Sequence, residues 1–465
     1  MPDLVLLCLH AVAVLGTSST PLHASPRDTV ATPLGARLDS ALVVASQRGF
    51  SGVVRVERGG TLLLRKGYGL ANREQRIPFS DATVVQIGSN TKDFTLVALL
   101  RLQQRGRLSM GDGLGKYFPS APADKRGITL QQLVDHRGGF PIGVGGDFEP
   151  TSREQLVARA LSTPLRAPPG TREIYSNVGY ALLAAVIEQV TGTSYDMHVR
   201  NDILVALGLE RTGYLLPRFD PNDLAHGYER GEDRGNVLLK PHAADGPYWN
   251  LRGNGGMLST VEDMHAFYRA LFEGERLLPR DARNGRFDPN EPVGLAGSDL
   301  VHFFLYERMP RAGVEIIIAT NSAESRAPMI RDLILPLLGL RPPNAHADAA
   351  PAAPPPGAKE PLPAIASLIH ELLTTVNGGD SAAMRRLAEQ RFVQDGGPTI
   401  AQRAERLRTM HERLGVLTPT AMWLNREGEV MVAATSASEG ALTLTFDLTA
   451  DTPPKIRTMR VMVGG

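Results

Sequence analysis

The chain has 465 residues, of which 42% are apolar and 21% charged, as in a globular protein with a sizeable core. Fifty basic and 49 acidic side chains give a formal charge of +1, which argues against an electrostatic nucleic-acid binder because such a protein needs a net basic surface. The single cysteine, Cys8, excludes an internal disulfide framework and a cysteine zinc site. The histidines contain no H-x-x-x-H pair, so we expect no metal and no cofactor.

The N-terminus carries the pattern of an export signal. Leu4–Leu15 is a short apolar run, and a small, polar stretch follows it up to Ser25. The run has the length of a signal-peptide core and is too short to span a membrane. We therefore expect residues 1–24 to be a signal peptide, the protein to be exported to the periplasm or secreted, and no transmembrane span. Met1-Pro2-Asp3 lacks the usual basic residue, so a mis-assigned start or a buried N-terminal segment is the alternative.

The large unit, predicted at residues 36–340, begins and ends with strand patterns. Gly59-Gly60 supplies a turn between two strand-like runs, which indicates a hairpin. The predicted strands are Gly52–Glu57, Thr61–Tyr68, Val301–Glu307 and Val314–Thr320. Apolar spacing predicts the helices Ser89–Gln104, Asn177–Val190, Val261–Phe272 and Met329–Leu338. Strands at both ends with helices between them predict an α/β fold of the α+β type, with an antiparallel sheet flanked by helices and an all-helical region.

A linker separates this unit from a smaller one at residues 364–465. Residues 341–363 are rich in proline and alanine and have no apolar periodicity, which is typical of a semi-rigid linker. In the small unit, three helical patterns precede four strand patterns. The helices are Ala364–Val376, Ser381–Phe392 and Thr399–Leu414, and the strands are Pro419–Leu424, Glu429–Ala434, Ala441–Leu448 and Ile456–Val463. This order predicts a small α+β cone.

Ser89 and Lys92 form the first candidate catalytic pair. Ser89 lies where a loop turns into a helix, and Lys92, three residues later, falls on the same helical face. A serine hydroxyl needs an adjacent base or charge to become a nucleophile, and the positive potential of a helix N-terminus favours the developing alkoxide. The alternative is that Ser89 only caps the helix while Lys92 is solvated.

Tyr175 and Asn177 form the second candidate. A Pro-Pro-Gly-Thr turn leads into Tyr175-Ser176-Asn177 at the start of an apolar helix. A phenol near a lysine ammonium can accept a proton from Ser89 and return it to a leaving group, while Asn177 can bind Lys92 and a substrate carbonyl. Tyr248-Trp249-Asn250 has the same spacing, but it lies in a loop rich in Gly and Pro, so we prefer Tyr175.

These two motifs in this order resemble the serine β-lactamase and penicillin-binding-protein superfamily. They are most similar to its class C-like branch, which also holds esterases and D-amino-acid peptidases. Further family-like segments are residues 128–136, 168–171, 207–212 and 255–263. The resemblance implies a covalent acyl-enzyme on Ser89, with Lys92 and Tyr175 as its activating pair. His136 and Asp263 lie in these segments, and we expect structural roles for both.

The sequence departs from the family at the third motif, a Lys or His followed by any residue and Gly. The best match is Leu295-Ala296-Gly297-Ser298, which has Leu in place of the basic residue. Backbone N–H groups of Ser89 and Ser298 can still hold an oxyanion. The missing cation removes a donor for a substrate carboxylate, so we expect a serine hydrolase of small-molecule ester, amide or peptide substrates.

Two other functions stay open at this point. One is a β-lactamase or D-Ala-type peptidase, and the other is a non-catalytic ligand- or peptidoglycan-binding relative that kept the fold. The small unit resembles ketosteroid-isomerase-like cone domains in the order of its elements. We expect it to be a passive accessory module, with pairing of two copies through it left open as a homodimer.

Overall fold

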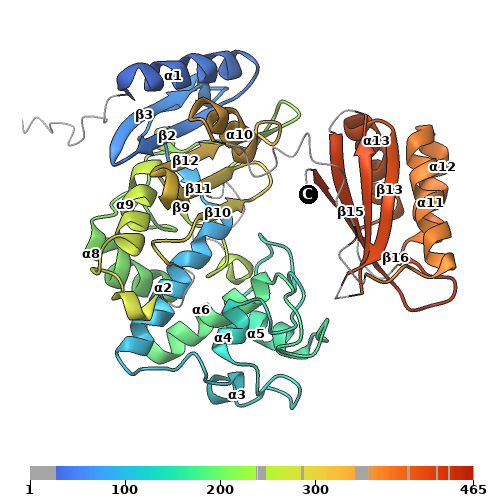
Figure 1. Ribbon diagram of the computed structural model, residues 1–465. Helices are drawn as coiled ribbons and strands as arrows, with labels where there is room; N and C mark the ends of the chain where they lie inside the picture. Colours follow the sequence, from blue (N-terminus) through green and yellow to red (C-terminus); the bar gives the residue numbers. More distant parts are fainter. Residues whose placement is uncertain are drawn as a thin grey trace, which may run out of the picture. The chain divides into compact units, whose positions relative to one another are not determined.

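The computed structural model describes residues 28–236, 238, 248–283, 287–340, 354, 358–394, 398–425, 428–437 and 440–463 (Figure 1). The predicted signal peptide and most of the predicted linker lie outside these residues. The chain divides into two compact units. One comprises the chain up to Leu130, Gly143–Ser162 and Asn177–Ala327, and the other comprises Gln131–Ile142, Thr163–Ser176 and the chain from Pro328 onward. The predicted domain boundaries at 340 and 364 stay predictions.

A six-stranded sheet forms the centre of the first unit. Its strand order is β1-β3-β2-β12-β11-β10, and every neighbouring pair is antiparallel. The strands are β1 (Thr29–Val30), β2 (Gly52–Arg58), β3 (Thr61–Tyr68), β10 (Val293–Ser298), β11 (Phe303–Met309) and β12 (Val314–Thr320). Segments from both ends of the unit therefore pair, and the predicted sheet is confirmed.

Helices cover both faces of this sheet. Side chains on a strand alternate between the faces, and Lys66 contacts Asp39 of α1 (Thr32–Gln47), whereas Arg65 contacts Glu262 of α9 (Val261–Phe272). The helices α1 and α9 therefore lie on opposite faces (Figure 1). The predicted helix at 261–272 is confirmed, and the Thr260 side chain caps it by accepting a hydrogen bond from the Asp263 N–H.

The helix α2 (Thr91–Gln104) runs through the interior of this unit. Its residues are buried on all sides from Thr91 to Leu100, as expected for a helix inside a core rather than on its surface. The rings of Phe94 on α2 and Phe267 on α9 stack with centroids 4.0 Å apart. This packing holds α2 firmly, and the predicted helix differs only in its start, where a 3₁₀ turn (Gly88–Asn90) comes first.

The remaining elements before the small unit are short strands and helices. The strands are β4 (Leu70–Asn72), β5 (Ile77–Pro78), β6 (Val85–Gln86), β7 (Gly227–Glu229), β8 (Glu232–Gly235) and β9 (Leu258–Ser259). The helices are α3 (Leu114–Tyr117), α4 (Leu130–Val134), α5 (Arg153–Ser162), α6 (Asn177–Thr191), α7 (Tyr195–Val199), α8 (Val205–Leu207) and α10 (Ala327–Leu337). Within the described residues, no helix has the length and apolar character that crossing a bilayer requires.

The C-terminal residues form three helices followed by a four-stranded antiparallel sheet. The helices are α11 (Pro363–Gly378), α12 (Ser381–Arg391) and α13 (Ile400–Leu414), and the strands, in sheet order, are β13 (Leu417–Leu424), β14 (Val430–Ser436), β15 (Gly440–Leu448) and β16 (Ile456–Val463). Val432 and Leu444 share a buried cluster with Leu372 and Leu407 of the helices, so the helices pack on one sheet face. The predicted element order is confirmed, and the resemblance to ketosteroid-isomerase-like cones stays a prediction.

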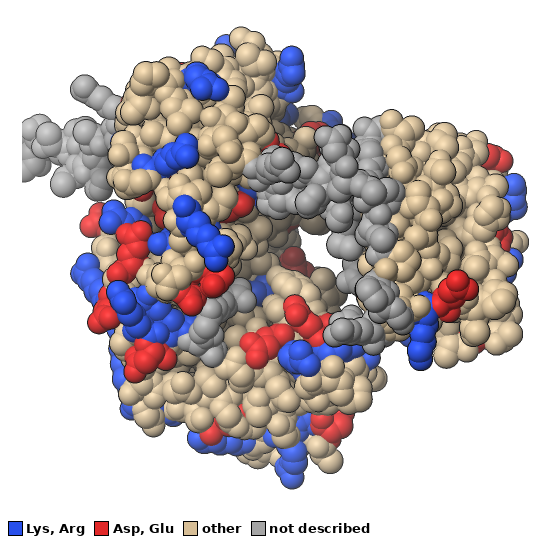
Figure 2. All heavy atoms as spheres, in the orientation of Figure 1, with Lys and Arg blue, Asp and Glu red and all other residues tan. Residues whose placement is uncertain are grey.

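Charged side chains of both signs are interspersed on the face drawn in Figure 2. Oppositely charged groups also form ion pairs in this structure: a nitrogen of Arg101 and an oxygen of Asp202 lie 2.7 Å apart, as do those of Arg159 and Glu149. The mixture agrees with the near-neutral net charge of the sequence.

Candidate active site

Ser89 and Lys92 lie together where the 3₁₀ turn enters α2. The Lys92 Nζ donates a hydrogen bond to the Ser89 Oγ at 3.1 Å and another to the Asn254 carbonyl oxygen at 2.7 Å. Lys92 is only 3% exposed, whereas Ser89 is half-buried. A buried amine is therefore fixed on the hydroxyl oxygen of a partly exposed serine.

The segment that receives Lys92 is itself held in place. The Thr95 Oγ1 donates to the Gly253 carbonyl oxygen at 2.7 Å, and the Tyr214 hydroxyl donates to that of Gly255 at 3.0 Å. The Asn254 Nδ2 donates to the Asn250 carbonyl oxygen at 2.8 Å. Sequence reasoning missed Asn254, although it directly precedes the family-like Gly255-Gly256-Met257 segment, which was the available indication.

The strand β10 carries the degenerate third motif and packs against the serine turn. A Cβ added to Gly297 would lie 2.6 Å from the Ser89 nitrogen and closer still to the Ile87 carbonyl oxygen. Gly88, whose φ is +51°, likewise approaches the backbone of Gly297 and Ser298. Only residues without a Cβ allow the two backbones this close, and the contact brings the Ser89 and Ser298 backbones side by side.

Leu295 stands on β10 where the family pattern has a cation. Its side chain is half-buried, and its carbonyl oxygen accepts a hydrogen bond from the Asn90 Nδ2 at 3.3 Å. The same Nδ2 donates to the Tyr268 hydroxyl at 2.7 Å. The main chain of Leu295 is thus anchored to the serine turn through Asn90. Its side chain is apolar and brings no positive charge to this position.

A turn stabilised by Asp299 follows Ser298. The Asp299 carboxylate accepts hydrogen bonds from the backbone N–H groups of Val301 and His302, at 3.1 and 2.6 Å, and pairs with the His302 Nδ1 at 2.9 Å. Burial works to raise the pKa of Asp299, but His302 and these backbone donors outweigh it and hold the pKa below its ordinary value. Leu300, at the tip, has a φ of +82° and is 79% exposed.

Tyr175 belongs to the second compact unit and is described within it. Its ring packs on that of His136 with centroids 4.5 Å apart, and the His136 Nδ1 accepts a hydrogen bond from the Ser176 N–H at 3.1 Å. Tyr175 is 43% exposed. His136 thus orients the tyrosine turn, whereas the pairing of Tyr175 with Ser89 and Lys92 stays a prediction.

Asn177 begins α6 in the first unit and lines a small cavity. Its Oδ1 is buried and has no hydrogen-bond partner among the described residues. Asn250, from the competing Tyr-x-Asn motif at residues 248–250, lines the same cavity. The structure therefore brings the asparagines of both candidate motifs to one place, which spacing along the sequence did not indicate.

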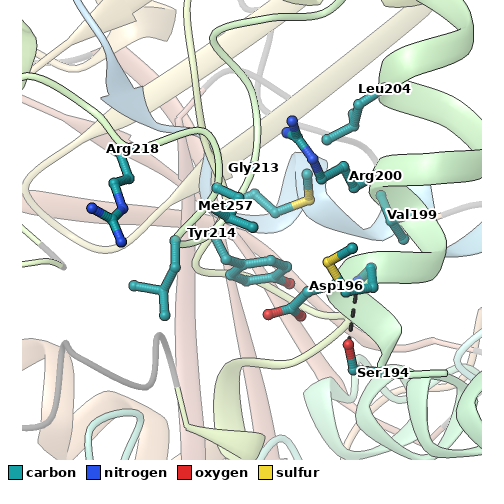
Figure 3. A pocket seen from close by; sticks show the side chains of 12 residues that line it. Ser194, Asp196, Val199, Arg200, Leu204, Gly213, Tyr214, Arg218 and Met257 are labelled. Atoms are coloured by element: carbon teal, nitrogen blue, oxygen red, sulfur yellow. Dashed lines mark hydrogen bonds between the residues drawn. The ribbon is translucent and has the colours of Figure 1, made fainter.

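A larger cavity lies beside the Gly253–Gly255 segment (Figure 3). It has a volume of about 480 Å³, and neither Ser89 nor Lys92 lines it. Figure 3 shows Tyr214 and Asp196 at its wall, with a hydrogen bond from the Met197 N–H to the Ser194 Oγ. The cavity is connected to Ser89 only indirectly. The Tyr214 hydroxyl donates to the Gly255 carbonyl oxygen, next to the Asn254 carbonyl oxygen that accepts from Lys92.

Among the described residues, two groups of side chains have the spacing of metal ligands. They are Glu57, His265 and Glu315, and Glu74, His226 and Asp233. In the first group, Arg55 hydrogen-bonds both Glu57 and His265, so a guanidinium already supplies the positive charge. In the second, the Tyr228 hydroxyl donates to Glu74. These contacts give several of the ligand atoms a partner within the protein, and the expectation of no metal stays a prediction.

A six-stranded antiparallel sheet between helices, with a Ser-x-x-Lys turn against its β10 edge, defines the class of serine β-lactamases and penicillin-binding proteins. The beta-lactamase family model matches residues 28–297, which is more than half of the chain. The chain belongs to the beta-lactamase family, and the resemblance drawn from the sequence is confirmed.

Relatives and solved structures agree with this family. A putative D-alanyl-D-alanine carboxypeptidase of Escherichia coli (strain K12) is 28% identical over 250 residues, 46% of this chain and 58% of that protein. Protein flp of Staphylococcus aureus (strain COL) is 32% identical over 184 residues, 38% of this chain and 37% of that protein. The chain thus spans less than two thirds of either relative. An octameric penicillin-binding-protein homologue from Pyrococcus abyssi shares the fold, with a TM-score of 0.57, 20% identity, and coverage of 92% of this chain and 89% of that one.

Proposed function

We propose that the protein is a serine hydrolase that forms an acyl-enzyme on Ser89. The observation that carries this proposal is the 3.1 Å hydrogen bond between the buried Lys92 Nζ and the Ser89 Oγ. A positioned amine at hydrogen-bond distance is what a hydroxyl needs in order to lose its proton as it attacks. Family membership supports the same chemistry, since the E. coli relative is named as a putative carboxypeptidase.

In this mechanism, the Ser89 oxygen attacks the substrate carbonyl carbon and its proton passes to the Lys92–Tyr175 pair. Backbone N–H groups of Ser89 and Ser298 stabilise the oxyanion of the tetrahedral intermediate. The contact of Gly297 with the serine turn supports this assignment, because it sets the two backbones side by side. When the intermediate collapses, the same pair returns the proton to the leaving group, and water then hydrolyses the acyl-enzyme.

Ester or amide substrates without a carboxylate beside the scissile bond fit this site best. Leu295 offers no positive charge to bind such a carboxylate. The backbone N–H groups proposed to stabilise the oxyanion act on the scissile carbonyl group and do not need a substrate carboxylate. A β-lactamase or D-Ala-type peptidase is the second candidate, supported by the family and by the name of the E. coli relative. A non-catalytic, ligand-binding relative is the third, supported only by Leu295.

Two assays test the proposal. A fluorophosphonate should label the wild-type protein but not Ser89→Ala; no wild-type adduct, or an undiminished adduct on the variant, would reject acyl-enzyme formation on Ser89. Short p-nitrophenyl esters should be hydrolysed faster than nitrocefin, and the opposite preference would favour the β-lactamase alternative.

We further propose that the protein is exported and that the C-terminal residues 364–465 form a passive accessory module. The apolar run Leu4–Leu15 supports export, and N-terminal sequencing of the protein from a fractionated culture tests it. The helix-plus-sheet core at residues 364–465 supports a separate module. Sedimentation of the full chain tests whether two copies pair.

A further inference from the structure

The small cavity beside α6 is lined by groups that accept hydrogen bonds. It has a volume of about 20 Å³, and a water-sized group needs roughly 10–15 Å³. The residues around it are Gly143, Val144, Gly145, Asp147, Leu156, Asn177, Val178, Ala181 and Asn250. It therefore has room for one small polar group.

Asn250 presents its amide oxygen, and its neighbours fix that orientation. Its Nδ2 donates to the Gly146 carbonyl oxygen at 2.7 Å and to the Thr151 Oγ1 at 3.3 Å. A carbonyl can only accept, so the nitrogen end must face Gly146. Asn250 is 7% exposed, and its Oδ1 is buried without a hydrogen-bond partner among the described residues. A buried acceptor of this kind calls for a donor.

Asn177 and Asp147 add two further acceptors. The Asn177 Oδ1 is also buried and unpartnered within the described part of the chain, and the Asp147 carboxylate has no hydrogen bond or ion pair with a described side chain. Asp147 lies at the exposed edge of the cavity. Partial desolvation by its neighbours raises the pKa of its carboxyl, and the negative charge of Asp299 raises that pKa further, against a smaller opposing effect of Lys92. The local potential at Asp147 therefore favours a cation.

The cavity is connected to the candidate nucleophile. The Asn250 carbonyl oxygen accepts a hydrogen bond from the Asn254 Nδ2, and the Asn254 carbonyl oxygen accepts one from the Lys92 Nζ. Asp147 also lies near enough to Lys92 for the lysine charge to lower its pKa. These contacts tie the wall of the cavity to the lysine that holds Ser89.

We propose that this cavity binds the primary ammonium group of the substrate. Three acceptors, one of them a carboxylate, match the three N–H donors and the charge of –NH₃⁺, whereas a water molecule has only two donors. The substrate class is then an amide or ester of an amino acid, or a peptide, with a free α-amino group. This inference rests on the proposed hydrolase, and it also agrees with the apolar Leu295, which leaves no cation on β10 to favour an anionic substrate instead.

Binding can be tested without turnover by using the full chain with Ser89→Ala. In calorimetric titration at pH 6, we expect this protein to bind leucine amide, in at least one enantiomer. We expect Asp147→Asn in the same background to bind it roughly 10- to 100-fold more weakly, the range set by a charge-assisted hydrogen bond. N-acetyl-leucine amide, which lacks the charge, should bind weakly to both proteins. Glu154→Gln removes an exposed carboxylate on α5 that does not line the cavity, and it is the matched control.

Asp147→Glu retains the charge, so it should bind leucine amide more tightly than Asp147→Asn if the carboxylate acts as proposed. Equal affinity of the Asp147→Asn protein and its parent would overturn the proposal, and so would equal binding of the acetylated and free amides. Absence of binding would mean that the cavity holds only water. If the fluorophosphonate labels the wild-type protein but leucine amide binds the Ser89→Ala protein independently of Asp147, the ammonium site is rejected and the hydrolase is not. If leucine amide binding depends on Asp147 but the wild-type protein gives no fluorophosphonate adduct, the hydrolase is rejected and the ammonium site is not.

Discussion

Gly297 offers the sharpest test of how the serine turn is held, because its contact with Ser89 is between backbones. A Cβ at this position would lie 2.6 Å from the Ser89 nitrogen, whereas real Cβ atoms essentially never come within 3.0 Å. In Gly297→Ala, β10 and the serine turn must therefore separate by several tenths of an ångström. The larger conflict with the Ile87 carbonyl oxygen adds to this displacement.

The displacement separates two of the N–H donors proposed for the oxyanion. Misplacement by about 1 Å costs roughly 100-fold in rate, so we expect Gly297→Ala to lower kcat for a p-nitrophenyl ester by about 10- to 100-fold. Overpacking should also lower the free energy of unfolding by about 1–3 kcal/mol. Urea unfolding and steady-state kinetics measure the two effects separately.

Gly294 provides the matched control on the same strand. A Cβ added to Gly294 meets nothing within 4 Å, so Gly294→Ala should leave both kcat and the free energy of unfolding nearly unchanged. If Gly297→Ala kept kcat within two-fold of the wild type, the close approach of β10 would not position the oxyanion donors. Equal losses in both variants would mean that any substitution on β10 disturbs the strand.

Three further predictions concern the surroundings of the serine. Lys92→Arg should lower kcat/KM by roughly 10²–10⁴-fold, since a guanidinium cannot exchange protons near neutral pH. Tyr214→Phe should lower the free energy of unfolding by about 1 kcal/mol and reduce kcat, because the Gly255 carbonyl oxygen loses a donor. Asp299→Asn should destabilise the protein by about 1–3 kcal/mol at pH 7. That difference should vanish in acid. A carboxyl group whose pKa is lowered in the folded protein stabilises the fold at pH values above its ordinary pKa of 3.8, and this stabilisation is lost as the pH falls through the lowered pKa.

Each of these predictions has a contradicting outcome. Arginine at position 92 with near-normal kcat/KM would mean that the lysine only fills space. Unchanged kcat in Tyr214→Phe would show that the wall of the larger cavity has no influence on the serine. A destabilisation by Asp299→Asn that stays constant from pH 7 to pH 2 would mean that the carboxylate charge contributes nothing and that only its shape matters.

Local patterns in the sequence sufficed for the parts of the site that lie close together along the chain. Lys92 follows Ser89 by three residues, so helical geometry alone sets their side chains side by side. Apolar spacing predicted the helix at Val261–Phe272 for an equally local reason, and of the two polar residues that precede it, Ser259 and Thr260, the structure shows that Thr260 caps it. The four strands predicted in the large unit were likewise visible as runs of β-branched and apolar residues.

Contacts between distant segments could not be predicted in the same way. The Asn254 carbonyl oxygen accepts a hydrogen bond from a lysine far earlier in the sequence. The family-like segment that follows Asn254 marks the region, but no local pattern identifies this carbonyl group as the partner of the lysine. The strand β10 contains two glycines and few β-branched residues, so it lacks the residue pattern of a strand and was not among the predicted strands. Asn250 lines the same cavity as Asn177. The Tyr-x-Asn spacing at residues 248–250 gave no indication that the two asparagines lie close together.

The hold on Lys92 has a consequence for sequence variation. Its 2.7 Å acceptor is the carbonyl oxygen of residue 254 and not a side chain. Any amino acid at that position supplies the same oxygen, provided that the main chain keeps its course between Gly253 and Gly255. The Asn254 side chain has a separate task, because its Nδ2 helps to hold this stretch of backbone on the Asn250 carbonyl oxygen. Harmful mutations should therefore concentrate at the three side chains that fix the course of the main chain here, Thr95, Tyr214 and Asn254.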